Sequence, residues 1–124
     1  MRMFAVSVAI LASVTLYAQP PSFQRGDLVR VKPSTTGDVT TPFVVRIVAV
    51  PGDRIRTRGA RLYVNDVPVS GFSQAFVKRV VNQPNRIPRV VPAGHCFVMG
   101  EQRANQDVSE YWGQHSELSL ERAP

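Results

Sequence analysis

The sequence has one cysteine and two histidines, and this scarcity excludes several kinds of site. Cys96 stands alone among 124 residues, so the chain cannot form an intrachain disulfide. With only His95 and His115 beside that thiol, no spacing of the kind that holds a zinc ion is present. We therefore expect no metal and no cofactor. The pair His95-Cys96 lies in an apolar run and is interpreted as packing.

Lysine is scarce as well, whereas arginine is abundant. Thirteen arginines but only two lysines, Lys32 and Lys78, contribute to a net charge of +6. Such a charge suits nucleic acid or an anionic membrane surface. However, the arginines are scattered along strand-like stretches, and the sequence shows no basic helix, aromatic stacking platform or zinc site. We therefore predict that nucleic acid is not a partner.

The pattern of turns and apolar residues predicts one mostly β domain. Ten prolines and eight glycines disfavour a helical bundle and favour short strands. Residues 28–32 alternate, with Val29 and Val31 on one face, and residues 43–50 form an apolar strand interrupted by Arg46. Asn65-Asp66 predicts a two-residue hairpin. Further strands are expected at 54–58, 76–81 and 95–99, with loops at 33–42 and 82–88 and a connection at 100–113.

Residues 43–51 and 76–84 resemble one another. Both stretches begin with Phe-Val, contain an arginine and end at proline. Buried strands often look alike, so we interpret this similarity as coincidence and not as an internal repeat.

The first eighteen residues form a separate hydrophobic segment. Arg2 precedes an uncharged run from Met3 to Ala18, which as a helix would span about 24 Å, less than the roughly 30 Å of a hydrocarbon core. The segment is either a cleavable export signal or a short membrane anchor, with a buried core helix as a third interpretation. Signal and anchor both export residues 19–124. We thus divide the chain into a segment 1–18 and a β domain 19–124.

Four segments, taken in order, resemble the conserved boxes of bacterial type I signal peptidases. The first is residues 25–29, which contain Gly26-Asp27, and the second is residues 45–53, which contain Arg46 and Pro51-Gly52-Asp53. The tail of the second box, residues 62–69, also resembles the family. Residues 91–100 resemble the strand before the last box, which begins at Gly100. The positions that carry the resemblance are Gly26, Asp27, Arg46, Pro51, Gly52, Asp53, Gly100, Arg103, Ser109, Trp112 and Gly113. The resemblance implies a mostly β, partly barrel-like fold with a hydrophobic anchor helix, which favours the anchor interpretation of residues 1–18.

The resemblance also implies a serine nucleophile and a lysine base, and neither is found where it is expected. The nucleophile should lie nine residues before Asp27, at Ala18, and the base should precede Arg46, at Val45. A methyl group cannot attack a carbonyl, and an isopropyl group cannot accept a proton. Loss of either group costs on the order of 10^6 in turnover in the comparable serine-peptidase triad.

The residues that support the dyad in the family differ here too. The last box has Glu101-Gln102 where the family has Asp-Asn, Gln106 at its serine position, and Val108-Ser109-Glu110 in place of Asp-Ser-Arg. We expect Arg46 to pair with an acid, with Glu101 and Glu110 as candidates. A relocated dyad of Ser22 and Lys78 is the alternative source of activity, and it requires the two side chains to meet.

These observations favour a catalytically inactive, signal peptidase-like protein of the bacterial cytoplasmic membrane. Its β domain would lie on the extracytoplasmic side and bind an extended peptide or exported precursor protein by strand addition. An active, divergent signal peptidase is the first alternative. The second is a secreted basic β module without peptidase ancestry, which a fold lacking pairing between the strands at Gly26 and Phe43 would favour.

Overall fold

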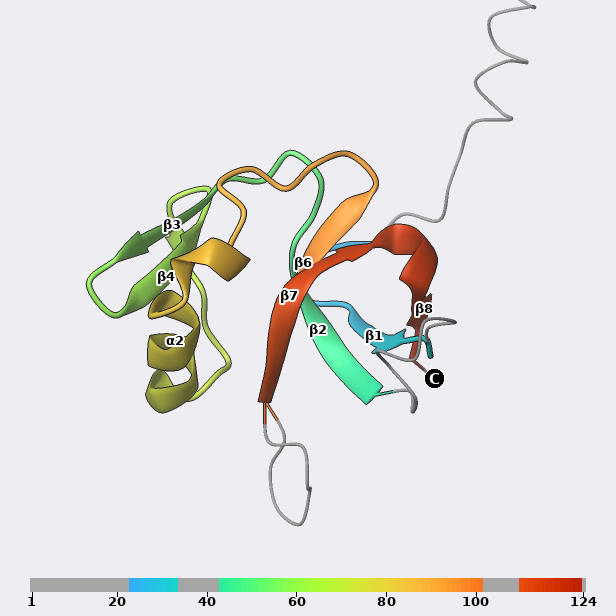
Figure 1. Ribbon diagram of the computed structural model, residues 1–124, viewed down its shortest axis with the longest axis horizontal. Helices are drawn as coiled ribbons and strands as arrows, with labels where there is room; N and C mark the ends of the chain where they lie inside the picture. The colour runs from blue at the N-terminus through green and yellow to red at the C-terminus, as the bar shows by residue number, and fades with distance from the viewer. Residues whose placement is uncertain (1–22, 34–42, 102–109, 124) are drawn as a thin grey trace, which may run out of the picture.

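Two antiparallel sheets and one α-helix make up the part of the chain that the computed structural model describes, residues 23–33, 43–101 and 110–123. This arrangement confirms the mostly β prediction (Figure 1). The predicted helix at 1–18 lies outside the described residues, as does the loop at 34–42. No helix in the described ranges is long and apolar enough to cross a bilayer.

The larger sheet has five strands in the order β7-β6-β2-β1-β8. Its strands are β1 (Leu28–Val31), β2 (Phe43–Ala49), β6 (His95–Glu101), β7 (Glu110–Ser116) and β8 (Leu120–Arg122). A short 3-10 helix, η2 (Glu117–Ser119), joins β7 to β8. β1 pairs with β2 along its whole length, with Val29 opposite Val45, which argues against the second alternative above, a secreted β module without peptidase ancestry.

One face of this sheet holds its own hydrophobic core, which we call the inner cluster. Val29 and Val31 are buried there, as their alternation with Arg30 and Lys32 predicts. The inner cluster consists of Phe23, Val29, Val31, Val45, Ile47, Cys96, Val98 and Leu120.

A register shift in β2 moves its side chains from one core to the other. Ile47 pairs with Val98, but Ala49 pairs with Phe97, so Val48 is an extra residue in β2. A bulge of this kind changes which face the following residues occupy. Val45 and Ile47 therefore belong to the inner cluster, whereas Val48 and Ala49 belong to a second core. This explains why the sequence of β2 is apolar almost throughout.

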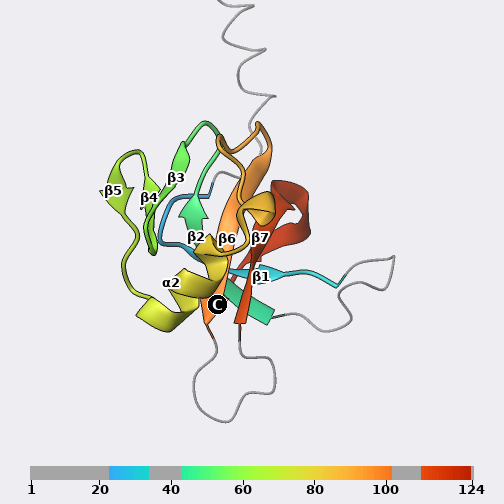
Figure 2. The same cartoon turned by 60° about the vertical axis from the view of Figure 1, so that its left-hand side comes forward.

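The remaining elements form a small lobe beside the large sheet (Figures 1 and 2). Its elements are β3 (Ile55–Arg58), β4 (Arg61–Val64), β5 (Val67–Pro68), α2 (Gln74–Val81) and η1 (Pro84–Arg86). Asn65 and Asp66 have φ values of 50° and 69° between β4 and β5. Positive φ at both central residues is what a tight hairpin of this type requires, so the predicted hairpin is confirmed.

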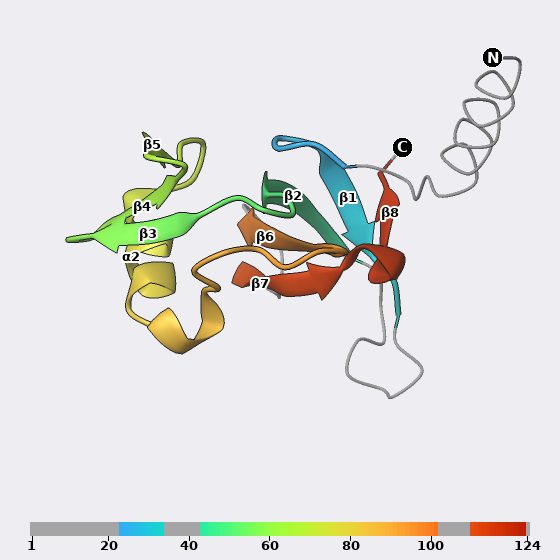
Figure 3. The ribbon, with the colours of Figure 1, turned by 90° about the horizontal axis from the view of Figure 1, so that it is seen from above.

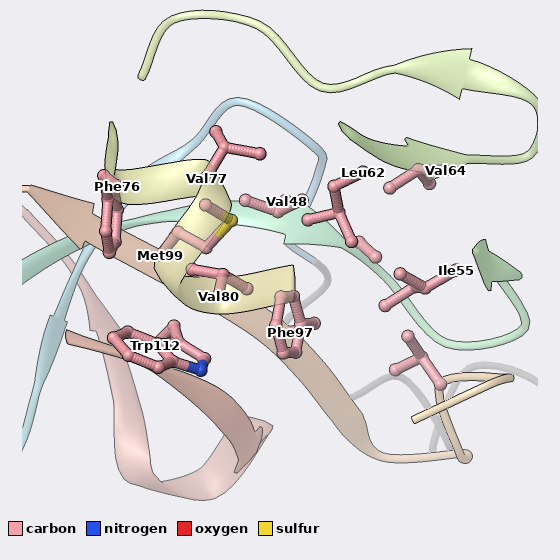
Figure 4. Close-up of a cluster of buried hydrophobic side chains, with 12 residues drawn as sticks. Val48, Ile55, Leu62, Val64, Phe76, Val77, Val80, Phe97, Met99 and Trp112 are labelled. Carbon is pink, nitrogen blue, oxygen red and sulfur yellow. The ribbon is translucent and has the colours of Figure 1, made fainter. Parts of the chain in front are cut away.

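The second core, which we call the shared cluster, joins the small lobe to the large sheet. It contains Phe97, Met99 and Trp112 from the large sheet. Figure 4 shows these side chains together with those of β3, β4 and α2. The whole cluster is Val48, Ala49, Ile55, Leu62, Val64, Phe76, Val77, Val80, Val91, Phe97, Met99 and Trp112.

The strand predicted at 76–81 is wrong, because these residues form most of α2. Ser73 caps the helix, and the Phe76 amide donates to its Oγ at 3.2 Å. Phe76, Val77 and Val80 are buried, which is the spacing of one helical face. This helical face packs in the shared cluster between the small lobe and the large sheet. The packing outweighs the strand preference of the three valines. Since 43–49 is a strand and 74–81 a helix, the two stretches are not a structural repeat.

The connection expected at 100–113 is also wrong at both of its ends. β6 continues to Glu101 and β7 begins at Glu110, and the two strands pair from His95–Ser116 to Glu101–Glu110. The polar composition of this segment concealed the strands, since β7 is an edge strand with one face only partly buried.

Candidate functional site

The residue at the expected position of the general base lies deep in the inner cluster. Val45 is 2% exposed and stands opposite Val29 of β1. On its other side lies Gly100 of β6, where a Cβ would come within 2.7 Å of Val45 Cγ1. The site is therefore apolar and desolvated, the kind of environment that lowers the pKa of a lysine. The valine found there has no proton-accepting group.

Beyond Gly100, the site continues to two polar side chains that the sequence did not single out. Tyr111 is opposite Gly100 on β7, and its ring contacts Phe43 with 4.8 Å between centroids. Tyr111 also forms a short hydrogen bond with Nε2 of His115, which lies four residues further along the same strand. Burial lowers the pKa of His115 and raises that of Tyr111, so both side chains favour their neutral forms at pH 7. Tyr111 and His115 are four residues apart, and an even separation places two side chains on the same face of a strand. This spacing is the sequence signal that could have identified the pair.

Cys96 also lies on this side of the sheet and is chemically quiet. It is fully buried opposite His115. Burial, followed by the negative charges of Glu117 and Asp53, raises the pKa of the thiol to about 11. A thiol that stays protonated is a poor nucleophile, which agrees with the packing interpretation for Cys96. His95, in contrast, is only half-buried, with its Nδ1 3.0 Å from the Ala93 carbonyl oxygen.

The Gly-Asp box and the box arginine meet where β1 begins. Gly26 has a φ of 93° and donates its amide to the carbonyl of Ile47 at 2.8 Å. Arg46 Nη1 donates to the Gly26 carbonyl at 2.7 Å. The expectation that Arg46 pairs with Glu110 is wrong, because Glu110 forms an ion pair with Arg79. The side chain of the other candidate, Glu101, is outside the described part.

Asp27 links this turn to β8 through Arg122. Its carboxylate accepts the Gln24 amide at 2.9 Å and Arg122 Nη1 at 3.1 Å. The hydrogen bond from the Gln24 amide lowers the pKa of Asp27, burial opposes this, and Arg122 lowers it further. Asp27 thus serves turn geometry.

Asp53 connects three parts of the molecule through one carboxylate. It is 6% exposed and accepts the Val50 amide at 2.9 Å, Arg25 Nε at 2.8 Å and Asn65 Nδ2 at 2.9 Å. Burial alone would raise the pKa of Asp53, but these hydrogen bonds and the charge of Arg25 outweigh it and lower the pKa. The Pro51-Gly52-Asp53 turn is therefore structural, and its ion pair with Arg25 is a contact that the sequence analysis did not predict.

A hollow of about 210 Å³ lies between these turns and the small lobe. Arg25, Gly26 and Arg46 line it on one side, and Val67 and Pro68 of β5 on the other. Within the described ranges, no three His, Cys, Asp or Glu side chains gather where they could hold a metal ion.

The remaining predicted site residues fall in different places. Ala18, Ser22, Arg103 and Ser109 lie outside the described residues. Lys78 is exposed on α2 in the small lobe, whereas Val45 is in the large sheet. Trp112 is buried at 7% exposure, with the guanidinium of Arg86 stacked 4.4 Å from its ring centroid. Trp112 is therefore a residue of the hydrophobic core.

Comparison with known proteins agrees with this geometry. The profile of the family described as "Signal peptidase, peptidase S26" matches residues 4–120. The chain belongs to the signal peptidase family. It is similar to Signal peptidase I U of Bacillus subtilis, with 32% identity over 67% of this chain and 46% of the relative. It is also similar to Signal peptidase I of Pseudomonas aeruginosa, with 28% identity over 72% of this chain and 39% of the relative.

A solved structure gives the same result for the fold. The crystal structure of a signal peptidase I from Enterococcus faecalis V583 superposes with a TM-score of 0.52 and 27% identity, over 86% of this chain and 99% of that chain. The family and fold predictions are thereby confirmed. The chain spans about half or less of the length of the curated relatives named above.

Proposed function

We propose that this protein is a signal peptidase-like binding protein that holds extended segments of exported precursors without cleaving them. The observation that carries the proposal is Val45, a 2% exposed aliphatic side chain within the inner cluster at the position where the family's general base is expected. The surrounding scaffold is retained, including the close fit of Gly100 against Val45. A protein that keeps the signal peptidase scaffold but has valine at the position of the base is better suited to bind a peptide than to hydrolyse it.

An extended peptide would bind to such a scaffold by adding a strand to an open sheet edge. β7 and β8 are the two edge strands of the large sheet. Backbone hydrogen bonds along an edge supply affinity that does not depend on a nucleophile. Loss of the dyad therefore removes turnover without removing the means of binding.

We further propose that residues 1–18 attach the protein to the bacterial cytoplasmic membrane with the β domain on the extracytoplasmic side. The basic flank at Arg2 and the uncharged run after it support this orientation, because positive flanks stay on the cytoplasmic side. The partners are then exported precursor proteins, as the family membership suggests.

The test is to restore the expected dyad in the full-length protein in detergent. A precursor peptide with an Ala-x-Ala site is offered to the natural protein, to Ala18→Ser, to Val45→Lys and to the double variant. We expect binding without cleavage by the natural protein and each single variant, and cleavage by the double variant. The single variants are the matched controls, because each supplies one half of the dyad.

Cleavage by the natural protein that is lost on Ser22→Ala or Lys78→Ala would overturn the proposal in favour of a relocated dyad. Absence of peptide binding by the natural protein would overturn it as well. Lys78 enters this comparison as an exposed residue of α2, so its replacement by alanine should leave the fold intact.

A further inference from the structure

The positive charge of the chain is concentrated in the small lobe. Residues 54–89 contain eight lysines and arginines but one acidic residue, Asp66, whereas the rest of the chain contains seven basic and eight acidic residues. The net charge of +6 thus arises entirely from these 36 residues. A charge separated in this way creates a field on one part of the surface.

The strand pairing places most of these arginines on one face of the small sheet. Ile55, Leu62 and Val64 are buried in the shared cluster on the side of α2. Since alternate residues of a strand point to opposite faces, the residues between them lie on the other side. These are Arg54, Arg56 and Arg58 of β3 and its approach, and Arg61 and Tyr63 of β4.

Figure 3 views the molecule from this side, with β3 lying across α2. Arg89 joins the same surface, because Arg54 forms a bridge with its neighbour Val90. We call Arg54, Arg56, Arg58, Arg61 and Arg89 the arginine face.

Most of the arginine face has no counter-charge among the residues that the structure describes. Arg56 pairs with Asp66 at 2.8 Å, an ion pair whose side chains are 73% and 61% exposed. The other four arginines are exposed and make no ion pair with any residue that the structure describes. Four guanidinium groups are therefore available to an external anion.

The surface is hollowed between these side chains. One hollow of about 400 Å³ is lined by Arg54, Arg56 and Arg89. A second of about 470 Å³ is lined by Arg56, Arg58 and Tyr63. Both hollows include Asp66 and Arg56, so they adjoin one another. The face thus offers two neighbouring sites of similar size and not a single deep pocket.

The chemistry of this face suits phosphate groups spread over a surface. A guanidinium group donates two parallel hydrogen bonds to a phosphate, which a lysine cannot do. Alternate residues of a strand are about 6.6 Å apart, so the β3 arginines span roughly 13 Å. Tyr63 and the 52% exposed Val90 lie among them, and aromatic and apolar groups mixed with arginine are typical of the headgroup level of a membrane.

We propose that the arginine face docks on the anionic headgroups of a phospholipid bilayer and forms a second membrane contact in addition to residues 1–18. The choice of a bilayer over other polyanions rests on the membrane attachment proposed above. A tethered domain meets the bilayer at high effective concentration, so even a modest electrostatic attraction would orient it. Docking would fix the small lobe, and with it the large sheet, against the membrane surface.

The test measures how the full-length protein distributes between two kinds of vesicle, one of phosphatidylcholine and one containing 30% phosphatidylglycerol. The ratio of the two binding constants cancels the contribution of the apolar segment, which is common to both. Each arginine near an anionic surface strengthens binding about five-fold at physiological salt. We therefore expect Arg54→Gln/Arg58→Gln to lower the ratio roughly 25-fold.

The matched control is Lys32→Gln/Lys78→Gln, which removes the same charge from exposed residues away from the arginine face. We expect this variant to lower the ratio less than about three-fold, because a charge beyond a Debye length of the surface is screened. Arg54→Lys/Arg58→Lys should retain most of the ratio, since it keeps the charges. Thermal melting of each variant verifies that it is folded.

An equal loss in the two glutamine variants would overturn the proposal, because net charge alone would then explain it. A ratio near one for the natural protein would overturn it too, and so would equal competition by a single-stranded oligonucleotide and by anionic vesicles. None of these results bears on peptide binding, which is measured in detergent without anionic lipid. The inference and the proposed function therefore fail separately.

Discussion

At the scale of single residues, the contact between Val45 and Gly100 decides what the site can hold. A Cβ on Gly100 would lie 2.7 Å from Val45 Cγ1, closer than packed atoms tolerate, and 3.2 Å from the Val44 carbonyl oxygen, which is a tight contact. The valine therefore fills the space beside this glycine. The glycine of the last box thus packs against the valine that stands where the family resemblance leads us to expect the base.

We predict that Gly100→Ala destabilises the protein by about 1–3 kcal/mol through overpacking. Val45→Ala removes the methyl groups that cause the clash, so the double variant should be more stable than the sum of the two single changes by at least about 1 kcal/mol. Urea denaturation of the four proteins provides the double-mutant cycle. Strict additivity would show that the two residues do not meet as described.

His115 should titrate below its ordinary value. Burial lowers its pKa from 6.5, so the unfolded chain binds the proton more tightly than the folded one. Stability is then full above about pH 6.5 and declines as the pH falls from there toward the folded pKa of His115. An NMR titration of the imidazole ring measures this directly. Tyr111→Phe is the control, because it removes the hydrogen bond but leaves the burial; a midpoint at or above 6.5 in the natural protein would contradict the prediction.

Residue-level reasoning from the sequence located Val45 but not its surroundings. Counting along the box from Arg46 was sufficient, because adjacent residues keep their spacing in any fold. Arg25 and Asn65 come together at Asp53 from positions 28 and 12 residues away. No local pattern predicts which of thirteen arginines meets a given carboxylate, since that depends on how the two lobes pack.

At the scale of secondary-structure elements, hairpins were predictable and α2 was not. Asn65-Asp66 specifies its turn through two residues that tolerate positive φ, so the signal is entirely local. In contrast, the sequence of α2 is rich in valine, and its helical state depends on burying Phe76, Val77 and Val80 in the shared cluster. Tertiary packing decided this element, and the strand prediction failed for that reason.

The stability of the Pro51-Gly52-Asp53 turn should depend on all the hydrogen bonds that the Asp53 carboxylate accepts, and not only on its ion pair with Arg25. Asp53 Oδ2 accepts hydrogen bonds from Val50 and Arg25, and Oδ1 accepts one from Asn65. An asparagine here would place its NH₂ group, a donor, against at least one of these N–H donors. We predict that Asp53→Asn costs roughly 2–4 kcal/mol. Thermal and urea unfolding measure the loss. Asp66→Asn is the control, because its ion pair is exposed and should cost less than about 1 kcal/mol.

The same variant tests the acid sensitivity of the turn. The folded pKa of Asp53 is below its ordinary value of 3.8, so its contribution is complete above about pH 3.8 and is lost as the pH falls through the folded pKa. Asp53→Asn should therefore show a flatter stability profile below pH 4 than the natural protein. Parallel profiles would assign the acid sensitivity to other carboxylates, with Asp27 the first to examine.

At the scale of the whole molecule, the two cores lie on different sides of the large sheet and share its strands. β2 contributes Val45 and Ile47 to the inner cluster and Val48 and Ala49 to the shared cluster, and β6 contributes alternately to both. A change in one core is therefore transmitted to the other through the same backbone. We therefore expect the small lobe, which has one short helix, to depend on this coupling for its stability.

We predict that the two lobes unfold together, and each core has its own natural probe. Trp112, the only tryptophan, reports on the shared cluster, and the buried Cys96 thiol, which reacts when exposed, reports on the inner cluster. Val80→Ala removes a fully buried side chain and should cost about 1.5–3 kcal/mol, moving the fluorescence and thiol-labelling midpoints equally. Lys78→Ala, on the exposed face of the same helix, should move neither by more than about 0.5 kcal/mol. If Trp112 changed at a lower denaturant concentration than Cys96, the small lobe would be a separate folding unit, and its arginine face could then act independently of the sheet that holds Val45.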